Sequence, residues 1–113
     1  MGEMEKLIVD FQETMRVLSE TNRETMHHFR TFMDSVLTKK VLDTKTKELI
    51  ALATAITARC SYCISIHVKN ALAAGATREE ILEAATVAIL MGGGPAFTYV
   101  TEVKKALDEF GPK

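Results

Sequence analysis

The chain has 113 residues, of which 47% are hydrophobic and 26% are charged, and its formal net charge is −1. This length suits a single domain over residues 1–113 with a modest core. The near-neutral charge gives no electrostatic basis for binding nucleic acid or an anionic membrane surface. Acidic residues interrupt the N-terminal segment, and we expect neither a signal peptide nor an apolar stretch long enough to span a membrane. These features predict a cytoplasmic protein.

The spacing of apolar residues predicts a helix over residues 3–19. Its apolar side chains recur three and four positions apart, as an amphipathic helix requires; they are Leu7, Ile8, Phe11, Met15 and Leu18. A core of this size cannot cover so much additional apolar surface. We therefore expect the first helix to take part in oligomer packing.

The next two helices are predicted from their capping residues. Thr21 and Glu24 form a candidate capping box for a second helix, which continues through Leu37. The pair Lys39–Lys40 suits the last turn of that helix, where the helix dipole favours cations. Asp43 is the expected N-cap of a third helix.

The boundary between the third and fourth helices has no obvious signal, because residues 48–74 contain neither Gly nor Pro. We place the break at Arg59-Cys60-Ser61, with Ser61 or a neighbouring residue as the N-cap of the fourth helix. Gly75 is a suitable residue for ending that helix, because glycine readily adopts the left-handed conformation.

The remaining elements follow from clear start and stop signals. Thr77 and Glu80 form a capping box for the next helix. The glycines at residues 92–94 stop it, the proline that follows suits the first turn of a final helix, and the Gly-Pro pair at 111–112 ends the series. No segment shows the alternating pattern of a strand. The sequence therefore predicts an all-α fold with about six helices.

Glu48, Cys60, Cys63 and His67 form the pattern that indicates function, Glu-x11-Cys-x2-Cys-x3-His. On a helix, the two cysteines and the histidine would fall within roughly 60° of one another. Two thiols and a base on one face are the components of a dithiol redox site. In a reducing cytosol, a single Cys-x-x-Cys pair favours catalysis or metal binding over a structural disulfide.

Each of these residues has an expected role in thiol chemistry. His67 lies four positions after Cys63, where a helical pair can hydrogen-bond and the imidazole can favour the thiolate. A helix N-terminus would stabilise the thiolate further. Cys60 would then close a disulfide after Cys63 has reacted. Glu48, on an adjacent antiparallel helix, could orient and polarise His67.

Three other interpretations of this pattern remain open. Cys60, Cys63 and His67, together with Glu48, offer ligand types that zinc accepts, although no second Cys or His pair completes a usual structural site. The cysteines could also be inert core residues, and His67 a core histidine with a satisfied hydrogen bond. His27–His28 is a weaker metal candidate and fits an exposed helix surface better.

Three segments of the chain, in order, resemble the carboxymuconolactone decarboxylase family. They are residues 42–53, which contain Glu48, then Cys60-Ser-Tyr-Cys63-x3-His67, and then Ala74-Gly-Ala-Thr77-x-Glu-Glu-Ile81. The chain is similar to the alkylhydroperoxidase D-like branch over about residues 25–110. The resemblance implies an all-α core over those residues, with an antiparallel helix pair carrying the site and assembly into trimers or hexamers. Residues 1–24 would lie outside that core.

The resemblance also implies roles for individual residues. Cys63 would attack a hydroperoxide and become a sulfenic acid. Cys60 would first donate a proton and would then convert the sulfenic acid to a Cys60–Cys63 disulfide. Glu48 and His67 would form a proton relay. A dithiol or lipoyl-bearing donor would return the electrons, and no cofactor is implied.

Two departures from the best-known members concern the substrate. Tyr62 replaces a histidine of their relay and is only an auxiliary candidate, since a phenol with a pKa of ~10 is no base at neutral pH. The chain also holds one helical unit where those proteins hold two, so the substrate could be a disulfide instead of a hydroperoxide. Lactone decarboxylation is not expected, because those family members generally lack the cysteine pair. The alternative function is a non-catalytic, zinc-binding or redox-sensing oligomeric module.

Overall fold

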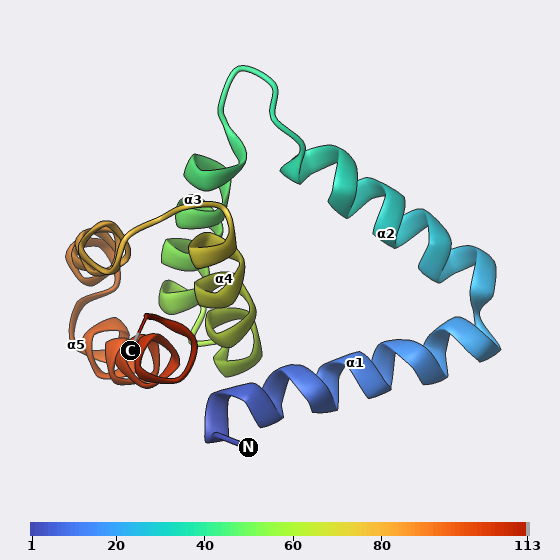
Figure 1. Ribbon diagram of the computed structural model, residues 1–113, viewed down its shortest axis with the longest axis horizontal. Helices are drawn as coiled ribbons and strands as arrows, with labels where there is room; N and C mark the ends of the chain where they lie inside the picture. The colour runs from blue at the N-terminus through green and yellow to red at the C-terminus, as the bar shows by residue number, and fades with distance from the viewer. Residues whose placement is uncertain (113) are drawn as a thin grey trace.

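The computed structural model describes residues 1–112, and within them the chain is helical without strands (Figure 1). The helices are α1 (Glu3–Thr21), α2 (Arg23–Leu37), α3 (Thr44–Thr57), α4 (Ser61–Ala73) and α5 (Arg78–Phe110). Gly93 interrupts α5 with a non-helical backbone, so that α5 consists of two helical segments. The all-α prediction is confirmed, and so is the predicted stop at the glycines.

The core lies among α3, α4 and α5, which pack closely against one another. Each helix contributes an aliphatic or small face to it. The largest fully buried side chains in this region are Leu52, Ile56, Ile64, Val68, Ile81, Val103 and Leu107. α3 and α4 run side by side (Figure 1) and bring distant residues of the predicted site together.

The predicted caps of α3 and α5 are confirmed. Asp43 accepts a hydrogen bond from the backbone N–H of Thr46 at 2.8 Å. Thr77 and Glu80 cap each other reciprocally, with bonds of 3.1 and 2.9 Å. The Thr77 backbone N–H is the main reason why the pKa of Glu80 is lowered from its ordinary value.

The predicted caps of α2 are wrong. The N-cap is Asn22, which makes no side-chain capping bond, and the Thr21 hydroxyl donates backwards to the carbonyl of Val17. α2 ends at Leu37, so Lys39–Lys40 lies beyond its last turn. Thr21 is the last residue of α1, so Asn22 takes the N-cap position of α2, and the Thr21 hydroxyl oxygen accepts a hydrogen bond from Nδ2 of Asn22.

α1 and α2 form an arm that leaves the body of the molecule and returns to α3 (Figure 1). Only the start of α1 is anchored: Met4 is buried, and the Glu109 carboxylate accepts hydrogen bonds from the backbone N–H groups of Met4 and Glu5. No residue of α2 is buried, and Phe32 is 66% exposed. The apolar face of α2 therefore contacts little of its own chain.

α5 is long and apolar enough to cross a membrane by length and composition, contrary to the expectation from the sequence. Residues 84–101 carry no charged side chain. Core helices have the same composition, and α5 packs on α3 and α4. Gly93, with a φ of 69°, also breaks the helix in the middle of this stretch. Composition alone does not make α5 a membrane span.

Candidate redox site

The turn between α3 and α4 begins with a tight helix ending. The backbone N–H of Arg59 bonds to the carbonyl of Ile56, and that of Cys60 bonds to the carbonyl of Ala55, both at 3.1 Å. These two bonds form a Schellman motif, in which the residue after the helix is left-handed. Arg59 occupies that position with a φ of 57°. The predicted break at residues 59–61 is confirmed.

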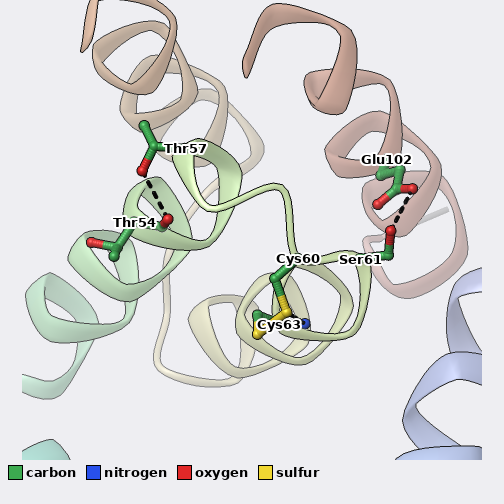
Figure 2. Close-up of a disulfide and its surroundings, with 6 residues drawn as sticks. All are labelled: Thr54, Thr57, Cys60, Ser61, Cys63 and Glu102. Atoms are coloured by element: carbon green, nitrogen blue, oxygen red, sulfur yellow. Dashed lines mark hydrogen bonds between the residues drawn. A yellow bond between two sulfur atoms is a disulfide. The ribbon is translucent and has the colours of Figure 1, made fainter. Parts of the chain in front are cut away.

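Cys60 is the N-cap of α4. Its Sγ accepts a hydrogen bond from the backbone N–H of Cys63 at 3.2 Å, and the two sulfurs are joined in a disulfide (Figure 2). Both cysteines are partly exposed. Cys60 precedes the helix, which corrects the expectation that it lies on the same helical face as Cys63 and His67. A sulfur at this position receives a helix N-terminal N–H, which favours a thiolate after reduction.

Glu48 and His67 form a direct pair across α3 and α4. The Nδ1 of His67 lies 2.6 Å from Oε1 of Glu48, and Glu48 is only 3% exposed. The expected proximity of these two residues is confirmed. A buried carboxylate at Nδ1 fixes the orientation of the ring, compensates a positive charge on it, and leaves Nε2 for a second partner.

His67 lies one helical turn after Cys63 on α4. Among residues 1–112, no hydrogen bond joins His67 to either sulfur while the disulfide is closed. The two sulfurs therefore have different surroundings: Cys60 accepts a backbone N–H, whereas Cys63 shares its helix with the histidine. This asymmetry bears on which sulfur reacts first.

The zinc alternative has no assembled ligand set in this form of the protein. Over the part of the chain that the structure describes, no three His, Cys, Asp or Glu side chains are arranged to hold a metal ion. Two of the candidate ligands, Cys60 and Cys63, are bonded to each other. His27 and His28 lie on the exposed surface of α2, and the ion-pair partner of His28 is Glu24 at 3.7 Å.

Glu102 is a site neighbour that the sequence pattern did not reveal. Ser61, between the two cysteines, donates a hydrogen bond to its Oε1 at 2.8 Å (Figure 2). Its second oxygen is buried without a hydrogen-bond partner in the described structure. One signal could have identified it, because Glu102 is the first charged residue after eighteen uncharged ones.

Tyr62 lies between the cysteines on the outer side of α4 and is 46% exposed. It replaces the histidine expected from the resemblance, and no hydrogen bond of its hydroxyl occurs within the described residues. Its auxiliary role stays a prediction.

The sequence and the fold both match known proteins. The model of the carboxymuconolactone decarboxylase family matches residues 23–106. This chain belongs to that family. An uncharacterised protein in the cox locus of Paracoccus denitrificans is 46% identical over 68 residues, which is 60% of this chain and 61% of that protein. The match thus spans about three fifths of that relative's length.

Two solved structures of the family have the same fold as this member. A family protein from Legionella pneumophila is 34% identical, with a TM-score of 0.93 and coverage of 97% of this chain and 98% of that chain. A Thermotoga maritima family protein is 27% identical, with a TM-score of 0.81 and coverage of 90% and 87%. An involvement in antioxidative response has been suggested for the Thermotoga protein.

Proposed function

We propose that this family member is a cytoplasmic, thiol-dependent redox enzyme of the alkylhydroperoxidase type. The observation that carries the proposal is the Cys60–Cys63 disulfide at the start of α4, one helical turn before the His67 that pairs with the buried Glu48. A Cys-x-x-Cys disulfide and a carboxylate-oriented imidazole are the parts that a two-cysteine peroxidase needs. The suggested antioxidative role of the Thermotoga relative agrees with this chemistry.

The reaction starts from the reduced protein. The Cys63 thiolate attacks the outer oxygen of a hydroperoxide, the O–O bond breaks, and the alkoxide takes a proton and leaves as an alcohol. Cys63 is then a sulfenic acid. The Cys60 sulfur displaces its hydroxyl group as water and closes the disulfide. A dithiol donor returns two electrons and two protons.

In this proposal the Glu48–His67 pair moves the protons. His67 uses Nε2 to take the thiol proton and to return one to the leaving oxygen. Glu48, which holds Nδ1 at 2.6 Å, orients the ring and balances its charge while it carries the proton. Cys60 supplies the second proton before it attacks.

The enzyme activity is tested by steady-state consumption of cumene hydroperoxide with dithiothreitol as the donor. Cys63→Ser should abolish turnover, because neither the attacking sulfur nor the disulfide remains. In the absence of dithiothreitol, reduced Cys60→Ser should be oxidised once per chain and then stop at the Cys63 sulfenic acid, because no resolving thiol remains. Undiminished turnover by Cys63→Ser would contradict the proposal that the protein is a thiol-dependent enzyme. Stoichiometric disulfide formation by the wild type without repeated turnover would favour a redox-sensing module instead.

We also propose that the protein is a homo-oligomer, with a trimer or hexamer as the expected assembly. The support is the apolar surface of the arm: Phe29, Phe32 and Val36 of α2 are all exposed in the single chain. So large an apolar face is usually covered. Light scattering after size-exclusion chromatography should give a mass of at least three chains, and a 12.5 kDa species would contradict the assembly.

A further inference from the structure

Arg59 is the one non-glycine residue with a positive φ in the described part of the chain. The left-handed conformation is unfavourable for a residue with a Cβ atom, and glycine is the usual occupant of this position after a helix. The equivalent position after α4 is indeed a glycine, Gly75, with a φ of 94°. An arginine after α3 therefore calls for a benefit that offsets its backbone strain.

Contacts within the chain do not supply that benefit. Arg59 is exposed, and across residues 1–112 its side chain makes no hydrogen bond or ion pair. Lys6, a cation that interacts electrostatically with Tyr62, is by contrast engaged, because it donates to Asp10 at 2.7 Å. Strain without local compensation is found mainly at functional positions.

The location of Arg59 indicates a function at the disulfide. It directly precedes Cys60, and adjacent Cα atoms are about 3.8 Å apart, so a flexible cationic side chain starts beside the disulfide. The N-terminus of α4 adds positive character at the same point. Tyr62, half-exposed between the cysteines, provides an uncharged neighbour. The residue next to the disulfide therefore carries an exposed positive charge that is unpaired within the described structure.

We propose that Arg59 is a substrate-recognition residue that selects a thiol electron donor carrying a carboxylate or similar anionic group. This inference rests on the proposed redox function and assigns the class of its reductant. The donor thiolate attacks one sulfur of the disulfide, forms a mixed disulfide, and releases the other cysteine as a thiolate. A second donor thiol displaces the first, so that the donor leaves as its own disulfide and both cysteines are reduced.

The test measures the rate at which stoichiometric thiol reduces the Cys60–Cys63 disulfide. Three thiols of similar size form a charge series: 3-mercaptopropionate, 2-mercaptoethanol and cysteamine. In Arg59→Gly, the rate ratio of 3-mercaptopropionate to cysteamine should fall by about fivefold at low salt, the scale of an exposed charge pair. Comparison of each variant with the wild type on the same thiol cancels the intrinsic reactivity of that thiol.

Three controls separate recognition from structure. Arg59→Lys keeps the charge and should retain the selectivity, whereas Arg59→Asn should lose it while tolerating the left-handed backbone. Lys40→Ala removes a surface charge from the α2–α3 connection and should leave the ratio within about twofold. Raising the salt to about 0.5 M should remove the selectivity of the wild type. Arg59→Gly relieves strain, so its unfolding temperature should not fall.

Equal slowing for all three thiols in Arg59→Gly would overturn the proposal, and so would an unchanged ratio. The assay starts from the oxidised protein and needs no hydroperoxide. Charge selectivity in a protein that lacks peroxidase turnover would therefore support Arg59 as the recognition residue while contradicting the peroxidase. Peroxidase turnover without charge selectivity would support the peroxidase and contradict Arg59 as the recognition residue.

Discussion

The turns at the two ends of α4 have the same backbone design and different residues. Each begins with a Schellman motif whose longer bond reaches back from the second residue after the C-cap: Cys60 to Ala55 in one turn, and Ala76 to Ala71 in the other. The α4–α5 turn uses Gly75 at the left-handed position, and Thr77 caps the following helix. The α3–α4 turn uses Arg59 and Cys60 for the same two tasks.

The difference shows where this protein gives up local stability. Glycine and threonine are the residues that such a turn favours. Arginine at positive φ and sulfur as a helix cap are poorer choices, but both can take part in chemistry. Departures from local preference are expected at functional sites. We therefore expect changes near the α3–α4 turn to affect reactivity, and changes at the α4–α5 turn to affect folding.

Among substitutions that keep both cysteines, the largest effect should come from Glu48→Gln, on the helix that leads into the α3–α4 turn. The introduced amide would still accept a hydrogen bond from His67 but would no longer balance a positive ring. We expect the pKa of the Cys63 thiol to rise, because the imidazolium that forms when His67 takes the thiol proton loses its counter-charge. Peroxide-dependent turnover should fall about 100-fold, the scale of losing one acid–base catalyst.

The measurement is the pH dependence of iodoacetamide alkylation on the reduced protein. His67→Gln should shift the profile in the same direction. Asn70→Ala, three residues further along α4, serves as a control for general disturbance of the helix. Profiles for Glu48→Gln and His67→Gln that coincide with the wild type would mean that no relay acts on the thiol.

Gly75→Ala should have the smaller effect and should act on folding. An added Cβ would meet no atom within 4 Å, so only the backbone conformation opposes it. We expect a loss of about 1 kcal/mol in the free energy of unfolding, with an unchanged rate of disulfide reduction. Urea unfolding at fixed protein concentration measures the loss, since assembly makes stability depend on concentration.

Gly94→Ala is the matched control for this substitution. Gly94 also has open space around its Cβ position but no positive φ. Alanine there should leave stability unchanged or raise it by up to about 1 kcal/mol, because it favours helix. A loss at Gly94 equal to that at Gly75 would indicate that the left-handed backbone is not the cause.

Local signals predicted most of the helix boundaries. Asp43, Gly75 and the Thr77–Glu80 box each act within four residues of the backbone that they cap, and all three predictions are confirmed. The Thr21–Glu24 box failed because Thr21 is still part of α1 and Asn22 takes the N-cap position of α2. The left-handed Arg59 had no signal at all, since arginine carries no preference for that conformation.

Of the contacts between residues far apart in the sequence, one could also be predicted and another could not. Glu48 and His67 could be paired from the sequence because two short-linked helices bring residues 19 positions apart together. Ser61 and Glu102 are 41 positions apart on different helices, and no periodicity relates them. The catalytic roles of the paired residues, in contrast to their positions, stay predictions.

The central claim is that Cys63 is the sulfur that reacts with peroxide and Cys60 the one that resolves it. The most direct test is mass spectrometry of reduced Cys60→Ser and Cys63→Ser, each treated with one equivalent of cumene hydroperoxide and a sulfenic-acid trap. We predict rapid trapping at Cys63 in Cys60→Ser and little at Cys60 in Cys63→Ser. Rapid trapping at Cys60 alone would contradict the claim and assign the attack to the sulfur that caps α4.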